Sequence, residues 1–392
     1  MSDLRISSAE TFLVGREWNN LLLVRVHTDD GLSGVGEGTM QWQAATVASA
    51  VELLFKRYLA GQSAFAIEKH VQAMYRNEYA RGGPVLNSAI AALEMSLWDI
   101  CGKALGQPVH RLLGGAVHDT IPAYANGWAG DVRDCDAVVG GAKAVATAGY
   151  GGMKFDPFWD LGADPDPGQL RRGLELVGRV RDAVDPDMRI MIDGHGRFSL
   201  GTANYVAHGL ADYDVYWFEE PVAPENFIAL GAMDRPPGLL IATGERCFSR
   251  YRYPQLIAEV RPHVLQPDII QVGGLMEGKK IAALADSHYL PVSFHSPFGP
   301  VATAAALQLD AATTNIVSQE SFSAYDLPWR KDLVTNYPMP VEGAYTVSTL
   351  PGLGVELNDA VVAEHPYREE AVQAMWSING SMTSWLDNAP IT

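Results

Sequence analysis

Cysteine and positive charge are both scarce in this chain. Its 392 residues include three cysteines, Cys101, Cys135 and Cys247, and no Cys-x-x-Cys pair. Scattered cysteines in an odd number argue against a disulfide scaffold and indicate a reducing compartment. Lys and Arg total 29 against 46 Asp and Glu, which gives a formal net charge of -17. Because so acidic a protein repels other polyanions, we expect neither nucleic acid nor membrane as a partner.

Long apolar runs and a dinucleotide-binding motif are also missing. No run approaches the length of a membrane span, and the N-terminal residues lack the apolar core of a secretory signal, so we expect a cytoplasmic protein. No Gly-x-Gly-x-x-Gly follows an early strand, which leaves a dinucleotide site without support. Apolar residues make up 47% of the chain and charged residues 19%, a composition that allows a large core.

Residues 1–120 carry strand and helix patterns in separate blocks. Alternating polar and apolar residues predict strands over 11–15, 21–28 and 32–37. Helical spacing follows, and its longest run covers 87–105. Strands and helices segregated in this way predict an α+β domain.

Residues 121–336 instead alternate short β-rich runs with helical stretches. Eight strands in this pattern predict a TIM-type (β/α) barrel, with an open doubly wound sheet as the alternative. The Pro- and Gly-rich segment 337–392 is expected to pack back on the first domain. The predicted barrel strands are 121–125, 152–157, 189–193, 215–219, 240–244, 264–270, 291–294 and 316–319.

Three carboxylates end successive barrel strands at one repeat interval. Asp193, Glu219 and Glu245 are each 26 residues apart, about the length of one β/α unit. Parallel strands place their carboxyl ends together, so these side chains should converge. Their mutual repulsion would be relieved by a hard divalent cation, for which Mg²⁺ is best suited and Mn²⁺ possible. The alternative is that each acid caps the helix that follows it.

Further polar residues continue this pattern around the predicted barrel mouth. Asp268 and His295 end neighbouring strands and would form a dyad in which the carboxylate fixes the imidazole tautomer. His195 lies between two glycines just after Asp193 and is a candidate acid for a leaving group. Each histidine could also be an ordinary loop or surface residue.

Lys154 and Asp156 lie two apart on a predicted strand, so both side chains could point into the barrel. A buried Lys–Asp pair that stabilises the barrel is an equally good interpretation.

Together these residues resemble the enolase superfamily, in its mandelate racemase branch, over nearly the whole chain. The resemblance implies an α/β fold in which an α+β N-terminal capping domain covers a modified TIM-type (β/α)7β barrel. It also implies magnesium-assisted removal of the proton next to a carboxylate. The motifs that carry it are Ala92-Leu93-Glu94-Met95-Ser96-Leu97-Trp98-Asp99, Gly102-Lys103, Gly106, Pro108, Leu112-Leu113-Gly114-Gly115, Phe218-Glu219-Glu220-Pro221, Gly244-Glu245, Gln266-Pro267-Asp268 and Gly273-Gly274.

Within that branch, the sequence resembles galactonate- and gluconate-type acid-sugar dehydratases. The resemblance implies that His295, oriented by Asp268, is the base at C2 and that His195 assists departure of the C3 hydroxyl. Glu320, at the end of the last strand, resembles the residue that binds the substrate carboxylate. These assignments imply a carbon–oxygen lyase of sugar-acid catabolism that forms a homo-oligomer, a dimer or an octamer.

One motif departs from the branch pattern and bears on the alternatives. Racemases and cycloisomerases of the branch carry Lys-x-Lys on the second barrel strand, whereas this chain has Lys154-Phe155-Asp156. Asp156 cannot replace a basic lysine, so a one-base elimination is favoured. An acid-sugar epimerase that uses His195 or Lys154 as second base stays open, as does a non-catalytic metal-binding homologue.

Substrate choice in this superfamily depends partly on loops of the capping domain. Arg16 and Trp18 in the loop 15–20 are our candidates for contact with the sugar chain, together with Lys154 and Asp156 from the barrel. An ordinary hairpin loop is the alternative.

Overall fold

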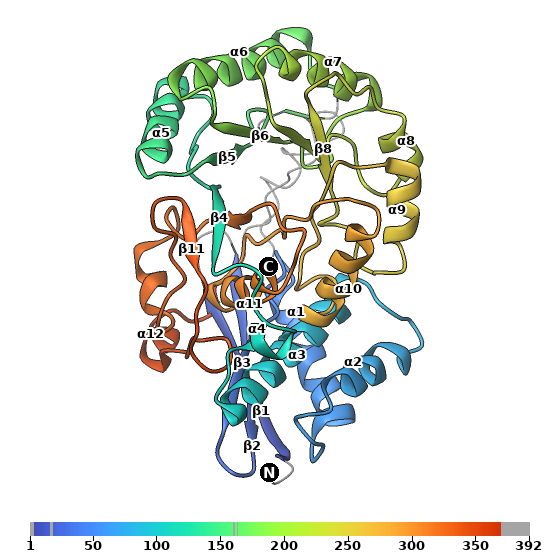
Figure 1. The fold of residues 1–392 in the computed structure, drawn as a ribbon, viewed down its shortest axis with the longest axis vertical. Helices are drawn as coiled ribbons and strands as arrows, with labels where there is room; N and C mark the ends of the chain where they lie inside the picture. Colours follow the sequence, from blue (N-terminus) through green and yellow to red (C-terminus); the bar gives the residue numbers. More distant parts are fainter. Residues whose placement is uncertain (1–3, 16–18, 160, 163, 370–392) are drawn as a thin grey trace.

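The computed structural model describes residues 4–15, 19–159, 161–162 and 164–369. In this part of the chain, a three-stranded antiparallel sheet lies apart from a larger, curled parallel sheet that helices surround (Figure 1). The prediction of an α/β fold with an α+β N-terminal domain and a barrel-like second domain is confirmed. Among the described residues, no helix is both long and apolar enough to cross a membrane.

The N-terminal sheet has the order β1-β2-β3 and packs against α3. Pro84 occupies the first turn of α3, and Gly106 ends the helix with a φ of 62°, where a side chain would be strained. The elements are β1 (Ile6–Gly15), β2 (Asn20–Thr28), β3 (Ser33–Glu37), α1 (Ala44–Leu54), the π-helix η1 (Phe55–Leu59), α2 (Ile67–Arg76), α3 (Pro84–Leu105) and α4 (Val109–Leu112).

The larger sheet has the order β10-β4-β5-β6-β7-β8-β9. Its elements are β4 (Thr120–Ala125), α5 (Cys135–Thr147), β5 (Gly152–Phe155), α6 (Pro167–Ala183), β6 (Arg189–Asp193), α7 (Leu200–Ala211), β7 (Trp217–Glu219), α8 (Phe227–Gly231), β8 (Leu240–Thr243), α9 (Tyr253–Val260), β9 (Val264–Leu265), α10 (Leu275–Asp286), α11 (Pro300–Ala311), β10 (Gln319–Ser321), the 3-10 helix η2 (Pro328–Asp332), β11 (Ala344–Thr346) and α12 (Asp359–Glu364).

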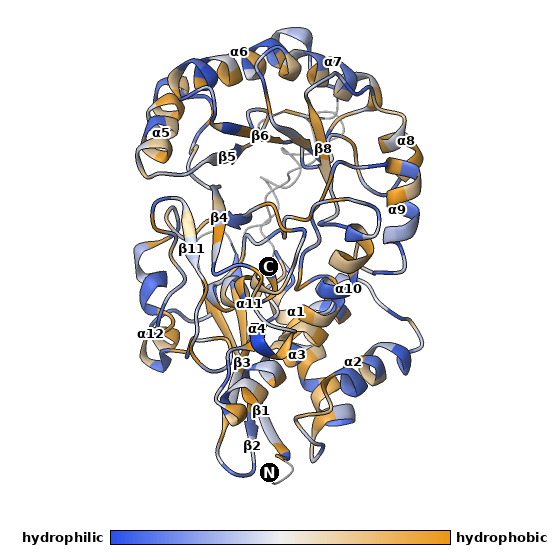
Figure 2. Ribbon diagram, viewed as in Figure 1, coloured by the Kyte–Doolittle hydropathy of each residue, from blue (hydrophilic) through white to orange (hydrophobic). Residues whose placement is uncertain are grey.

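The strand expected at 291–294 forms only isolated bridges. Val292 bridges in parallel to Leu265 of β9 and to Ile316, and these bridges continue the sheet from β9 toward the segment that leads into β10. Since β10 pairs with β4, the sheet curls back on its first strand. The helices around it are amphipathic, with hydrophobic and hydrophilic residues on different faces of α6 and α7 (Figure 2).

The C-terminal part of the described chain contacts both domains. Strand β11 pairs antiparallel with β4, and Pro366 bridges to Val14 of β1. The ring of His365 stacks on Trp329 at 3.7 Å. The boundaries that we place at residues 120 and 336 stay predictions.

Buried carboxylates of the N-terminal domain hold the helices of the barrel. Glu37 accepts hydrogen bonds from the backbone N–H groups of Gly299 (2.7 Å) and Ala302 (2.9 Å), at the start of α11. Glu94 of α3 does the same for Leu275 (2.9 Å) and Met276 (3.0 Å) at the start of α10. Helix N-termini carry unsatisfied donors and partial positive charge, so these acids join the two domains.

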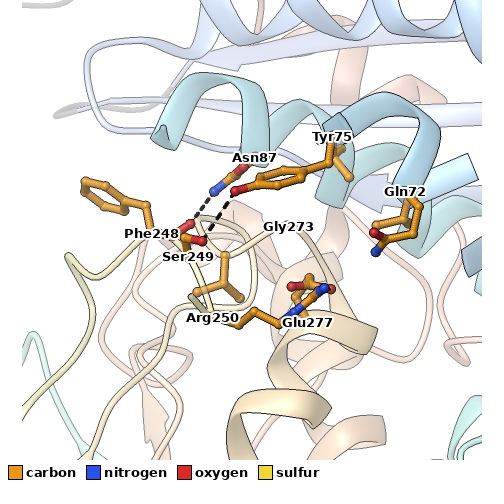
Figure 3. A pocket seen from close by; sticks show the side chains of 11 residues that line it. Gln72, Tyr75, Asn87, Phe248, Ser249, Arg250, Gly273 and Glu277 are labelled. Carbon is orange, nitrogen blue, oxygen red and sulfur yellow. Dashed lines mark hydrogen bonds and ion pairs between the residues drawn. The ribbon is translucent and has the colours of Figure 1, made fainter. Parts of the chain in front are cut away.

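A small pocket marks a second contact between the domains, and residues of α2, α3 and the loop after β8 line it (Figure 3). Asn87 of α3 donates to the backbone carbonyls of Phe248 and Gln271, the latter at 2.9 Å. The hydroxyls of Tyr75 and Ser249 lie 3.4 Å apart. These contacts fix the loop that follows β8, and Glu245 lies in the same loop.

Gly299→Ala tests the contact between Glu37 and α11. The added Cβ would lie 2.5 Å from both carboxylate oxygens of Glu37, whereas the φ of -99° itself suits alanine. We expect the free energy of unfolding to fall by about 1–3 kcal/mol in urea denaturation. Gly140→Ala in α5 is the control, because nothing lies within 4 Å of its added Cβ. There alanine should stabilise by about 0.5–1 kcal/mol, and equal effects at both positions would contradict the role of Glu37.

Candidate active site

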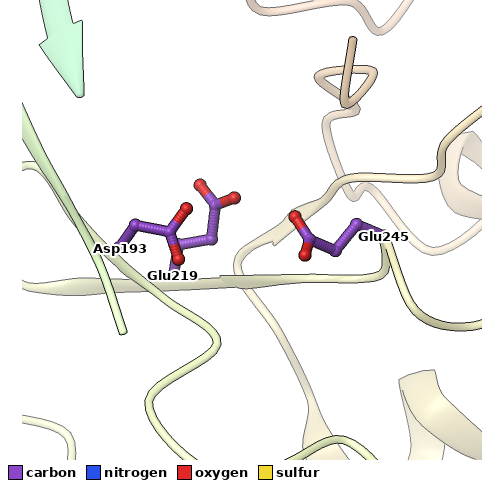
Figure 4. A group of neighbouring side chains, drawn as sticks. All are labelled: Asp193, Glu219 and Glu245. Carbon is purple, nitrogen blue, oxygen red and sulfur yellow. The ribbon is translucent and has the colours of Figure 1, made fainter. Parts of the chain in front are cut away.

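Three carboxylates meet at the carboxyl end of the parallel sheet. Asp193 and Glu219 are direct register partners on β6 and β7, and Glu245 lies two residues beyond β8. One oxygen of each lies within 4.8 Å of an oxygen of the other two. Figure 4 shows Asp193 and Glu219 side by side, with Glu245 facing them. The convergence predicted from their spacing is therefore present.

The chemistry of this donor set suits a hard divalent cation. Burial, followed by the nearby charge of Asp193, raises the pKa of Glu219 well above its usual value. Without a cation, the cluster therefore resists carrying three negative charges. Three carboxylate ligands could hold a metal ion and leave coordination positions open for another molecule.

Lys154 of β5 supplies part of the missing positive charge. Its Nζ lies 2.6 Å from Glu219, 2.9 Å from Glu320 and 3.2 Å from Asp193, and the side chain is buried. Burial lowers the pKa of Lys154, but Glu219 and Glu320 outweigh it and raise the pKa well above the usual value. Lys154 is therefore a fixed cation that does not pair with Asp156.

Asp268 and His295 form the predicted dyad. The Nδ1 of His295 lies 2.7 Å from Asp268 Oδ2, and a parallel bridge joins the two backbones. The other oxygen of Asp268 accepts from the N–H groups of Ile270 (2.8 Å) and Gln271 (3.0 Å). The other ring nitrogen of His295, Nε2, lies 3.3 Å from Glu245, so it faces the carboxylate cluster.

The charge state of His295 depends on that cluster. Burial lowers its pKa, but the charge of Glu245 and the hydrogen bond to Asp268 outweigh this and raise the pKa to about 10. A cation beside Glu245 would oppose the effect of the Glu245 charge and so lower the pKa of His295. Neutral imidazole, the form that can take a proton, is then easier to reach.

The histidine predicted as the acid lies at the other side of the cluster. His195 has its Nδ1 2.9 Å from Asp156 and its Nε2 3.5 Å from Asp193. Burial lowers the pKa of His195, but Asp193 and Asp156 outweigh it and raise the pKa to about 9. The ring is 24% exposed, which suits a group that delivers a proton to a small molecule.

Glu320 of β10 is held between three partners. Its Oε1 lies 2.9 Å from Lys154 and accepts from Asn126 at 2.8 Å, while its Oε2 accepts from the N–H of Ser296 at 2.8 Å. Burial raises the pKa of Glu320, but Lys154 outweighs it and the net shift is downward. An ionised Glu320 beside Lys154 can orient a bound polar molecule.

Several residues that complete this site did not emerge from the sequence. Arg197 binds Asp156, Gln266 donates to Glu219 at 2.6 Å, and Asn126 donates to Glu320. Gln266 belongs to the motif Gln266-Pro267-Asp268 noted in the sequence, but no role was assigned to it there. Arg16 and Trp18, the predicted contacts with substrate, lie outside the described residues.

Both domains of the chain match known protein families. The family model of the mandelate racemase / muconate lactonizing enzyme N-terminal domain matches residues 9–114, and the enolase C-terminal domain-like model matches residues 137–361. A D-gluconate dehydratase of Thermoproteus tenax is 34% identical over 368 residues, 92% of this chain and 73% of that protein. A D-galactonate dehydratase of Pectobacterium atrosepticum is 34% identical over 369 residues, 92% of this chain and 94% of that protein.

Solved structures of related proteins have a similar fold. The crystal structure of a mandelate racemase/muconate lactonizing enzyme from a Jannaschia species is 29% identical, covers 93% of this chain and 98% of its own, and has a TM-score of 0.86. One from a Sulfitobacter species is 26% identical, covers 93% and 96%, and has a TM-score of 0.88. The chain is therefore an enzyme of the enolase superfamily, in the branch of mandelate racemase and muconate lactonizing enzyme.

Proposed function

We propose that this enzyme is a hydro-lyase that converts a sugar acid, an aldonate such as gluconate or galactonate, into a 2-keto-3-deoxy acid and water. The observation that carries the proposal is the presence of two histidines at one carboxylate cluster. One lies beside Asp193 and the other beside Glu245. Elimination of water needs one group to take a proton and another to give one, and the relatives named dehydratases support this reading.

Asp193, Glu219 and Glu245 would hold a magnesium ion, and manganese suits the same oxygen donors. When bound, this ion supplies positive charge to the substrate carboxylate and to the negative charge that develops beside it. Lys154 would attract that carboxylate, and Glu320, 2.9 Å from Lys154, would hydrogen-bond it once Glu320 has taken up a proton.

The proton steps belong to the two histidines. His295 takes the proton from C2 through Nε2, while Asp268 keeps its Nδ1–H in place. His195 gives a proton to the C3 hydroxyl, the C3–O bond breaks, and water leaves. The resulting enol takes up a proton at C3 and loses the proton of its C2 hydroxyl, which gives the 2-keto-3-deoxy acid.

A screen of mono- and diacid sugars in D₂O tests the reaction. With Mg²⁺ present, we expect one or more aldonates to give a 2-keto-3-deoxy acid, detected with semicarbazide and by mass spectrometry. Deuterium at C2 of an otherwise unchanged sugar acid would instead identify an epimerase. If no acid sugar reacts, the proposal is wrong, and the alternative of a non-catalytic homologue gains support.

Asp193→Asn and Glu219→Gln test the metal site. Each removes one ligand charge, so we expect Mg²⁺ or Mn²⁺ to bind about tenfold or more weakly, a loss of about 1.4 kcal/mol. Titration calorimetry of the metal-free protein measures this without substrate. Glu175→Gln, which removes an exposed charge on α6, is the control and should bind as the wild type does. Unchanged affinity in both site variants would contradict the ligand assignment.

His295→Asn tests the base. We expect kcat to fall by about 10²–10⁴-fold, the usual contribution of a general base, and C2 deuterium exchange to fall with it. His208→Asn, at an exposed histidine paired with Asp234, should leave both rates unchanged. Full turnover by His295→Asn would rule out its role.

A further inference from the structure

We propose that Asp156 and Arg197 are positioning residues for the acid His195, so that the site contains two histidine–carboxylate dyads. This inference rests on the proposed function and deepens it. From the sequence we assigned Asp156 to substrate binding, but in the structure its oxygens are engaged by protein donors.

The first support is the way in which Asp156 is held. Both of its oxygens accept from the guanidinium of Arg197, at 3.0 Å for Oδ1 and 2.8 Å for Oδ2. Oδ1 also accepts from the N–H of Phe158 at 2.8 Å. A two-pronged Arg–carboxylate pair fixes the plane of the carboxylate as well as its position.

Arg197 is itself immobilised. Its side chain is 1% exposed, and NH1 also donates to the carbonyl of Phe158. A buried cation of this kind costs several kcal/mol in desolvation unless it is paired, so the pair with Asp156 has to persist. Arg197 also offsets the charge of Asp156, which favours retention of the Nδ1 proton by His195.

The second support is the orientation of His195. Its φ of 48° and the φ of 64° at Gly196 form a tight turn, and its backbone N–H donates to Asp193 Oδ1 at 2.9 Å. A side chain at a φ of 64° is strained, and a Cβ on Gly196 would lie 3.0 Å from the Cα of Ala223, so the turn favours glycine there. Trp159 meets the imidazole edge to face, with centroids 5.5 Å apart.

These contacts assign the two ring nitrogens. Asp156 is an acceptor at 2.9 Å from Nδ1, so Nδ1 carries a proton that stays there. Nε2 is the nitrogen on the side of the carboxylate cluster, 3.5 Å from Asp193. In the elimination, the N–H bond at Nε2 breaks as the C3–O bond breaks, and the leaving oxygen departs as water.

Asp156→Asn separates a positioning role from a structural one. The amide that replaces the carboxylate carries no negative charge and can donate to Nδ1, so it disfavours the Nδ1–H that His195 needs while it gives up the proton on Nε2. We expect kcat for dehydration to fall by about 10²–10⁴-fold with little change in KM. Exchange of the C2 proton in D₂O, which needs only His295, should continue.

A substrate with fluorine in place of the C3 hydroxyl gives a second test of the role of Asp156. Fluoride leaves with the electron pair of the C–F bond and needs no proton from His195, while the C2 proton goes to His295 as before. We expect Asp156→Asn to eliminate fluoride at close to the wild-type rate. Arg197→Lys keeps the charge but loses the two-pronged contact, and it should show the same pattern with a smaller loss.

A measurement without turnover completes the test. In protein with ¹⁵N-labelled histidine, the Nδ1–H of His195 should show the proton chemical shift of a hydrogen bond to a carboxylate, and Asp156→Asn should move this signal. The control is Asp234→Asn, at the exposed His208–Asp234 pair, which should change no rate and leave the His195 signals in place.

Two results would overturn the inference. Unchanged dehydration in Asp156→Asn and Arg197→Lys would show that His195 needs no such support. Equal losses of dehydration, C2 exchange and fluoride elimination would show that the pair only supports the fold. If the wild type neither exchanges nor dehydrates any acid sugar, the proposed function itself fails, and this inference fails with it.

Discussion

The central constraint in this structure is the crowding of like charges at the mouth of the barrel. Asp193, Glu219 and Glu245 lie within 4.8 Å of one another, and Glu320 is joined to them through Lys154. Burial makes their repulsion strong, because little water is present to screen it. The fold therefore has to bring positive charge to this place. Lys154 and the two histidines supply part of it, and a divalent cation would supply the rest.

The N-terminal domain contributes to the same arrangement from outside the cluster. Its carboxylates Glu37 and Glu94 cap barrel helices α11 and α10, and Asn87 holds the loop after β8 that contains Glu245. Both helices begin in the segments that follow Asp268 and His295. The domain therefore acts on the site through the helices and loops that carry its residues.

The two histidines make similar contacts, but the carboxylates that hold them have different partners. Each presents Nδ1 to a carboxylate and Nε2 toward the cluster. The carboxylate of His295 is held by backbone N–H groups, whereas that of His195 is held by a buried guanidinium. In both dyads the carboxylate keeps a proton on Nδ1 and leaves Nε2 for the reaction.

The sequence by itself determined the barrel and the convergence of its strand-end residues. Successive β/α units of nearly constant length place Asp193, Glu219 and Glu245 at equivalent points, and parallel strands bring such points together. For the same reason, the sequence placed His295 beside Asp268. Both results depend on where each residue lies within its β/α unit, and the spacing of residues along the sequence shows this position.

Only the tertiary structure decided which side chains pair across elements. Lys154 and Asp156 lie two residues apart at the end of β5 and could have paired, but Lys154 contacts Glu219 and Glu320, and Asp156 contacts Arg197 and His195. The caps made by Glu37 and Glu94 join residues 262 and 181 positions apart. No local pattern encodes such contacts, because they depend on how two packed elements meet and on how far each side chain reaches.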